Sequence, residues 1–128
     1  MGLNSQYWRD LGAPWGGAHA PAADVARFLR YFLQPTDRLV RAATARQMIT
    51  NQNTGLPGSS WGLGWKVGTG EFGKGCSAST FGHSGSTGTL AWADPTTRLI
   101  CVLLTSQPAE LSRSTLLGPV SDQVSQIR

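Results

Sequence analysis

The sequence predicts a mixed α/β protein of the α+β type, in which an antiparallel β-meander packs against a C-terminal helix and follows two N-terminal helices. One observation is an apolar pattern of helical spacing early in the chain. The other is a series of short apolar or alternating segments separated by glycine and proline turns. The length of 128 residues fits a single domain over 1–128. In it, 1–60 is a helical and loop region, and 61–128 holds the sheet and the last helix.

The first sixty residues should contain both N-terminal helices. Residues 1–20 are expected to be irregular, because glycines and prolines break any periodicity there. Residues 21–33 are predicted to be a helix that starts at Pro21 and stops before Pro35. Its buried side is formed by apolar residues at helical spacing: Val25, Phe28, Leu29, Phe32 and Leu33.

A second, shorter helix is predicted over 44–51. Thr44 is a plausible N-cap, and Met48 and Ile49 supply the buried side. The stretch 52–60 is rich in glycine, serine and asparagine and is expected to be a loop.

Four strands are predicted for the second half. Residues 61–68 alternate, so that three large apolar side chains would point to one side of the strand. Residues 80–86 and 89–95 are two shorter strands. Residues 99–104 are continuously apolar, which predicts a central strand covered on both faces.

The last helix is expected from Pro108 to the end of the chain, with a break or restart at Gly118-Pro119. Its apolar stripe would consist of Val120, Val124 and Ile127. Between the last two strands, Asp94 is expected to stabilise a turn through its side chain rather than to serve in catalysis.

Composition and charge narrow the class of protein. Hydrophobic residues make up 40% of the chain and charged residues 14%, as in a globular fold. The net charge is +4, but the basic residues are scattered, which favours a solvated surface over a nucleic-acid site. Only the arginines between 27 and 46 form a denser group and support nucleic-acid binding. No apolar run approaches a membrane span, and no signal-peptide pattern is visible.

The two cysteines and two histidines are not arranged as metal ligands, so no metal and no cofactor are expected. Cys101 lies in the apolar segment 99–104, where a free cysteine acts as a small apolar side chain. Cys76 lies in a glycine-rich loop. A disulfide between the two is the less favoured of two open possibilities. His19 matches no motif and is interpreted as a loop residue.

Four segments together resemble a known family. They are MGLNSQ at the start, GGAHAPAADVARFLRYFL at 16–33, WGLGWKVG at 61–68 and FGHSGSTGTLAWADP at 81–95. In this order they are similar to the last third of serine β-lactamase-like and penicillin-recognising proteins. The most similar branch holds class C β-lactamases, D-aminopeptidases and β-lactamase-like esterases. The resemblance implies part of a β-lactamase/transpeptidase-like fold and hydrolysis of amides or esters by acyl transfer, with β-lactams, D-amino-acid peptides or esters as substrates.

The chemistry of that family uses three motifs, of which this chain carries one. His83-Ser84-Gly85 matches the third motif, His-x-Gly, on the strand beside the active site. No serine is followed three residues later by lysine, and neither tyrosine is followed two residues later by asparagine. The resemblance therefore implies a hydrolase segment that is inactive alone. The alternative is a non-catalytic module, truncated or independent, that keeps only weak binding.

The candidate site lies in the stretch from His83 to Gly88. Gly85 and Gly88 would let a substrate backbone approach the strand edge, and His83 could donate a hydrogen bond or assist proton transfer. A structural histidine is the alternative for His83. The resemblance implies that the backbone N–H of Ser86 is an oxyanion donor. It also implies a substrate-binding group: Ser84, Gly85, Thr87 and Gly88.

The resemblance also implies partners. A small-molecule or peptide acyl substrate is expected once an N-terminal part supplies the nucleophile, whereas no nucleic acid or membrane is expected. Without that part, one face and one edge of the sheet would be uncovered, which favours a homo-oligomer or an N-terminal partner. The location stays open, because relatives are usually periplasmic or secreted and sometimes cytoplasmic.

Overall fold

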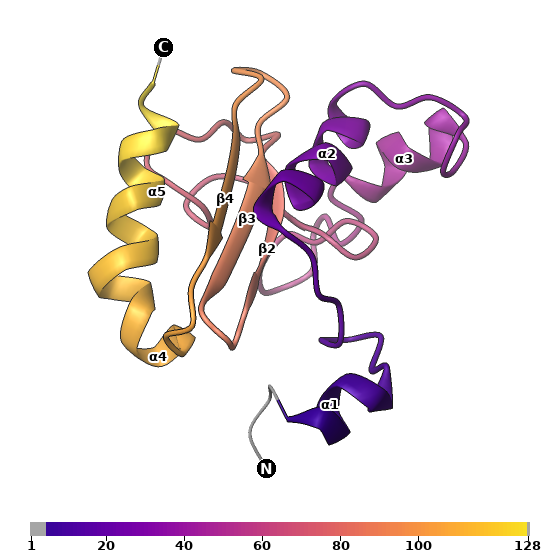
Figure 1. The fold of residues 1–128 in the computed structure, drawn as a ribbon. Coiled ribbons are helices and arrows are strands. Elements are labelled where there is room, and N and C mark those ends of the chain that lie inside the picture. The colour runs from indigo at the N-terminus through magenta and orange to yellow at the C-terminus, as the bar shows by residue number, and fades with distance from the viewer. Residues whose placement is uncertain (1–4, 128) are drawn as a thin grey trace.

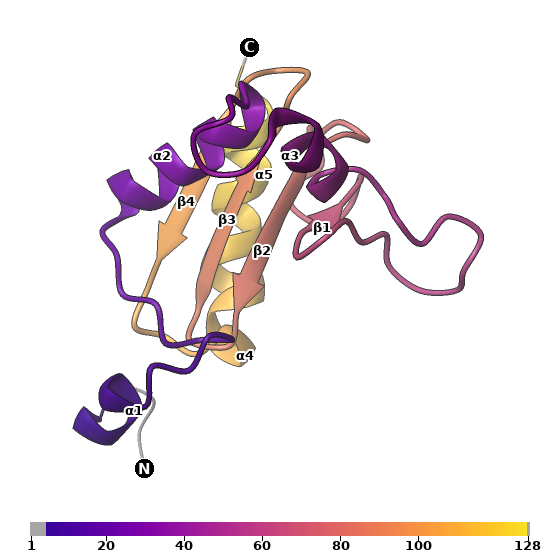
Figure 2. The same ribbon diagram turned by 90° about the vertical axis from the view of Figure 1, so that its right-hand side faces the viewer.

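The structure is a computed structural model that describes residues 5–127. Its four antiparallel strands are neighbours in chain order, β1-β2-β3-β4. One face of the sheet carries α2 and α3, and the C-terminal helical segment covers the other face (Figures 1 and 2). The elements are α1 Gln6–Leu11, α2 Ala22–Leu33, α3 Ala42–Met48, β1 Lys66–Val67, β2 Phe81–Gly85, β3 Thr89–Ala93, β4 Ile100–Leu104, α4 Ala109–Ser112, the π-helix η1 Arg113–Leu117 and α5 Gly118–Ser125.

The core has two halves because side chains alternate across the sheet. On the α2 side, Phe81 and Ala93 pack with Leu29 and Phe32 of α2. On the α5 side, the buried cluster comprises Phe72, Cys76, Leu90, Trp92, Cys101 and Leu117. Trp92 is fully buried, and its Nε1–H donates to the Ser121 hydroxyl at 2.7 Å. The indole therefore ties β3 to α5 by a hydrogen bond as well as by packing.

The helix predicted over 21–33 and the strands predicted over 80–86 and 89–95 are confirmed within one or two residues. The expectation of an irregular segment over 1–20 is wrong for Gln6–Leu11, where α1 forms, and is confirmed for 12–20, whereas residues 1–4 lie outside the described residues. The Ser5 hydroxyl accepts the Trp8 N–H at 3.3 Å, and Gly12 ends the helix with a φ of 57°. These two caps support a helix that is too short to show a periodic pattern.

The second helix begins two residues earlier than predicted and ends at Met48, so Thr44 is not its N-cap. The residue at the cap position is Arg41, which makes no side-chain cap hydrogen bond. The Asp37 carboxylate instead accepts the N–H of Ala42 at 2.7 Å. A carboxylate from outside the helix thus satisfies the donor that a capping side chain would otherwise take.

The long strand predicted over 61–68 is wrong, because only Lys66–Val67 pairs as β1. The residues before it form a tight turn in which the Gly62 N–H donates to the Trp65 carbonyl at 2.8 Å. A Cβ on Gly62 would lie 2.0 Å from the Met48 carbonyl oxygen, so this close approach requires glycine. Leu63 is exposed, so its side chain does not share a buried side with the other large apolar residues of 61–68.

The segment 99–104 forms β4, which is the last strand of the described sheet and not a central one. Its two faces are nevertheless covered as expected. Ile100 and Val102 pack towards α2, and Cys101 and Leu103 pack towards α5. The expectation of an uncovered sheet face is therefore wrong, whereas the outer edge of β4 has no neighbouring strand among residues 5–127.

The C-terminal helical segment is not interrupted at Gly118-Pro119, but α5 begins at Gly118, so the restart predicted there is confirmed. A five-residue π-helix, η1, leads directly into α5. The predicted stripe is confirmed only in part, because Val124 packs against the core but Ile127 is exposed, and the buried positions of the segment are Ala109, Ser112, Leu117, Ser121 and Ser125. Serines fit this face because loop residues Gly73 and Gly75 press against Ser125.

Both cysteines are buried free thiols, so the less favoured disulfide is not formed in this structure. Burial raises the pKa of Cys101 to about 11 and also raises the pKa of Cys76.

Asp94 has the structural role expected of it. Its carboxylate accepts the Ser77 N–H, the Ser77 hydroxyl and the Thr96 N–H at 2.7–2.8 Å.

Candidate functional site

The candidate site is built around the part of β2 that extends beyond β1. The Gly68 N–H donates to the Thr80 carbonyl at 2.9 Å, so the backbone groups of Thr80 point towards β1. Alternate residues of an antiparallel strand point the same way, which also places the backbone groups of Ser84 on this side. Since the last β1 partner is Lys66, opposite Gly82, the edge of β2 at Ser84 has no β1 neighbour.

His83 stands exposed at this edge. Its Nδ1 lies 2.7 Å from the carbonyl oxygen of Ser84. A carbonyl can only accept a hydrogen bond, so Nδ1 carries the proton and Nε2 is the acceptor of the neutral ring. The imidazole is therefore held by the strand that a substrate would contact, and Nε2 is available to that substrate.

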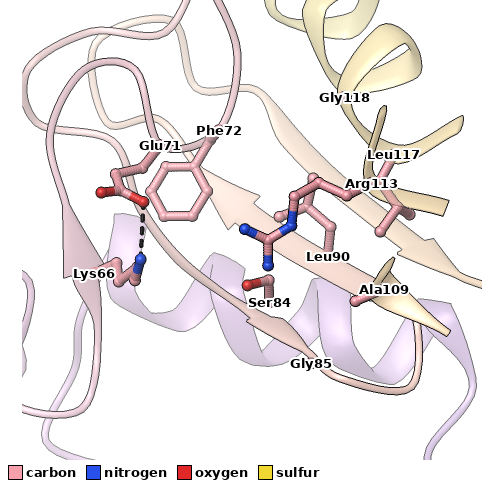
Figure 3. A pocket seen from close by; sticks show the side chains of 10 residues that line it. All are labelled: Lys66, Glu71, Phe72, Ser84, Gly85, Leu90, Ala109, Arg113, Leu117 and Gly118. Carbon is pink, nitrogen blue, oxygen red and sulfur yellow. Dashed lines mark hydrogen bonds and ion pairs between the residues drawn. The ribbon is translucent and has the colours of Figure 1, made fainter. Parts of the chain in front are cut away.

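Trp61, Lys66 and Glu71 were not predicted as site residues: Trp61 lies beside His83, whereas Lys66 and Glu71 line a cavity with Ser84. The Trp61 ring centroid is 5.6 Å from the His83 ring centroid and 5.6 Å from Lys66 Nζ. Lys66 Nζ also pairs with Glu71 Oε2 at 2.9 Å (Figure 3). The hydrogen bond from Lys66 lowers the pKa of the Glu71 carboxyl, so Glu71 is ionised at neutral pH.

Arg113 is a fourth site residue that sequence reasoning missed. Figure 3 shows its guanidinium group pointing from η1 towards Ser84. These two residues help to line a cavity of about 100 Å³ whose other walls include Glu71 and Leu90. An adjoining open cavity of about 480 Å³ is lined by Ser84, Gly85, Ser86, Ala109, Glu110, Arg113 and Ser114.

The two cavities are lined by two cations, Lys66 and Arg113, and two anions, Glu71 and Glu110, so a preference for an anion depends on Arg113. Lys66 is neutralised by Glu71, whereas Arg113 makes no ion pair within residues 5–127. Glu110 faces the outer cavity from the same helical segment and limits the positive potential there. A carboxylate could therefore bind Arg113 through charge-assisted hydrogen bonds and Ser84 through its hydroxyl.

The remaining predicted residues form the turn between β2 and β3. The Gly88 N–H donates to the Gly85 carbonyl at 3.1 Å, and the Ser86 carbonyl accepts the Ala109 N–H at 3.0 Å. Ser86 and Thr87 are exposed. Gly88 is buried with a φ of 82°, and a Cβ there would lie 1.7 Å from the Gln107 carbonyl, so the turn itself requires this glycine.

The turn also borders a different part of the surface. Ser86, Thr87 and the exposed His19 help to line a cavity of about 700 Å³ on the side of α1. The structure therefore brings His83, Ser84, Gly85 and Ser86 to one edge but places Gly88 inside the turn. The roles of these residues towards a substrate stay predictions.

Residues 5–127 hold neither a metal site nor a membrane-spanning helix. No three histidine, cysteine, aspartate or glutamate side chains there are grouped as metal ligands. No helix in that range is both long enough and apolar enough to cross a membrane.

Comparison with known proteins places this geometry in context. A family model described as Beta-lactamase matches residues 2–122. Among solved structures, the crystal structure of a β-lactamase from Mycobacterium bovis is similar, with a TM-score of 0.73 and 30% sequence identity. The match covers 82% of this chain and 43% of that one, so this chain spans less than half the length of the similar protein. No curated protein matches.

Proposed function

The chain belongs to the β-lactamase family, and on this premise we propose that it forms the strand side of a serine-hydrolase site for acyl substrates that carry a carboxylate. The observation that carries the proposal is the open edge of β2 at Ser84. An exposed histidine and an arginine without an ion-pair partner within residues 5–127 both lie next to this edge.

The open edge suits the backbone of an amide or ester substrate. An extended acyl group can exchange hydrogen bonds with the N–H of Ser84 as an added strand would. The Ser86 N–H at the start of the turn is the proposed donor to the oxyanion that forms on the attacked carbonyl. The free Nε2 of His83 is within the same edge and is the proposed proton acceptor or donor at the leaving group.

Arg113 and Ser84 support a preference for anionic substrates. The guanidinium group and the hydroxyl line one cavity beside the edge. A carboxylate on the leaving-group side of the substrate could occupy this cavity while its carbonyl lies at the edge. We therefore propose carboxylated β-lactams or peptides over neutral esters.

The acyl-transfer step itself needs groups that this chain does not carry. No Ser-x-x-Lys occurs, so a nucleophilic serine and its lysine base must come from outside these 128 residues for an acyl-enzyme to form. The same absence favours the second candidate function, a binding module that holds such ligands reversibly. Both candidate functions involve the same carboxylated acyl ligand. They differ in whether a further part supplies the nucleophilic serine and the lysine base.

The test is a titration of the ¹⁵N-labelled chain with benzylpenicillin and, in parallel, with its neutral methyl ester. We expect shifts of the Ser84 and Ser86 amides, and Arg113→Met should weaken binding of the acid about ten-fold or more but not that of the ester. Arg30→Met, which removes an exposed arginine of α2, is the matched control. Binding that leaves β2 unperturbed, or that ignores Arg113, would contradict the proposal.

A fluorescent penicillin separates the two candidate functions. The chain alone should not be labelled covalently, because it lacks the nucleophile and base. If the chain binds the fluorescent penicillin reversibly and is never labelled covalently, whatever the amount of penicillin added, the result favours the binding module. Labelling of the isolated chain would show that one of its own serines attacks the ligand, and both candidates would then need revision.

A further inference from the structure

The contact between Trp61 and His83 has a geometry that constrains the histidine. The ring centroids are 5.6 Å apart and the planes are inclined by 57°, which is within the range of favourable aromatic contacts. Because His83 is exposed at the edge of β2, few other groups restrict its ring. Its single described hydrogen bond, to the Ser84 carbonyl, fixes one atom but not the plane of the imidazole.

Trp61 is itself held firmly from several directions. Its backbone N–H donates to the side-chain oxygen of Asn53 at 3.0 Å, and its backbone carbonyl accepts the Gln52 N–H at 2.7 Å. It forms a β-bridge with Lys66, whose ammonium group lies over the indole at 5.6 Å. Glu71 holds that ammonium group at 2.9 Å. These contacts hold the backbone of Trp61, and the ammonium group of Lys66 lies over its indole, so the indole is placed to restrict the imidazole of His83.

We propose that Trp61 is a positioning residue for His83: its indole holds the imidazole in the orientation that keeps Nδ1–H on the Ser84 carbonyl and leaves Nε2 for the substrate. This inference rests on the proposed function of His83 at the edge of β2. The contact also explains a feature of the fold. The tight turn at Gly62, which comes directly before β1, brings Trp61 back beside Lys66 and next to His83.

The proposal is tested on the whole 128-residue chain without any substrate. Long-range ¹H–¹⁵N spectra report which ring nitrogen of each histidine carries the proton, and side-chain couplings report the rotamer. In Trp61→Leu, which keeps apolar bulk but removes the aromatic face, the population of the held His83 orientation should fall about two- to twelve-fold. Trp61→Phe should retain most of it. His19 serves as an internal reference because it should not change.

Trp15→Leu is the matched control, since Trp15 is an exposed tryptophan of a loop, with 77% of its surface accessible. The backbone amide spectrum shows whether each variant keeps the sheet. If Trp61→Leu loses the fold, Trp61→Phe is still compared with the wild type. A His83 signal that is averaged over several ring orientations in both proteins overturns the proposal. An unchanged His83 tautomer and rotamer in a folded Trp61→Leu also overturns it.

The outcome can be separated from that of the proposed function. The histidine spectra require no ligand, so a failed penicillin titration would leave the positioning of His83 by Trp61 intact. Conversely, a freely rotating His83 would leave the Arg113 dependence of penicillin binding intact.

Discussion

Removing the carboxylate of Asp94 should destabilise the protein more than the loss of almost any other polar side chain. Asp94 is 1% exposed and accepts three hydrogen bonds, two from Ser77 and one from the Thr96 N–H. A hydrogen bond to a charged group contributes about 1.5–3 kcal/mol. The donors are partly exposed and recover some hydration, so we expect Asp94→Ala to lower the free energy of unfolding by about 3–5 kcal/mol.

Urea denaturation followed by circular dichroism measures this change. With an m-value of about 2 kcal/mol/M, the midpoint should fall by about 1.5–2.5 M. Asp24→Ala is the control, because Asp24 is exposed and pairs only with exposed Arg27, so its loss should cost less than about 0.5 kcal/mol. A loss below 0.5 kcal/mol for Asp94→Ala would refute the view that this carboxylate holds the Cys76 loop to the turn after β3.

The effect also has a predictable pH dependence. Burial would raise the pKa of Asp94, but the hydrogen bonds from Ser77 and Thr96 outweigh it and hold the pKa below its ordinary value. A carboxyl with a lowered pKa stabilises the fold above the unfolded value of about 3.9, and this stabilisation is lost as the pH falls through the folded value. The difference in stability between wild type and Asp94→Asn should therefore shrink below about pH 4.

Two further predictions concern β4. Leu99 and Thr105 bond to β3, so the alternating residues Ile100, Val102 and Leu104 direct their backbone groups outward along an edge without charge or proline. The chain exposes 8353 Å², against about 6,600 Å² for a compact monomer of this size. We expect association that rises with concentration in light scattering and is reduced by Leu104→Lys, which places a charge on an exposed residue of this edge, and a monodisperse monomer at high concentration would contradict this. Cys101, with a pKa of about 11, should resist alkylation at pH 8 until urea unfolds the chain, and rapid labelling of the native protein would show that β4 opens locally.

The sequence was most informative where a pattern repeats over several residues. The apolar spacing from Val25 to Leu33 predicted α2 closely, and the glycine-bounded segments predicted β2 and β3. It failed where one local contact decides the outcome. The Asp37 carboxylate moved the start of α3, and the approach of Gly62 to the Met48 carbonyl turned a predicted strand into a tight turn. Such contacts join residues that no periodic pattern relates.

The candidate site was predictable only in part, for a related reason. His83, Ser84 and Gly85 form a continuous motif, so they could be recognised as a group. Arg113 lies far along the chain and is one of several scattered arginines, and only the packing of the C-terminal helical segment brings it to Ser84. Trp61 reaches His83 through the same turn that the alternating pattern concealed. Nothing in the sequence around Arg113 distinguishes it from an ordinary surface arginine, and nothing around Trp61 distinguishes it from a core tryptophan.

The π-helix has a consequence for how this chain tolerates changes in length. Ser112 and Leu117 are both buried, although residues five apart in a regular α-helix point in directions about 140° apart. The wider turn of η1 takes up one extra residue and so brings both onto the same side. Deleting one exposed residue between them, such as Leu116, would leave a spacing of four, which an ordinary α-helix accommodates with the same buried side. The segment before Gly118 is therefore the place in the helical layer where the chain can shorten by one residue without rotating Ser121 away from Trp92.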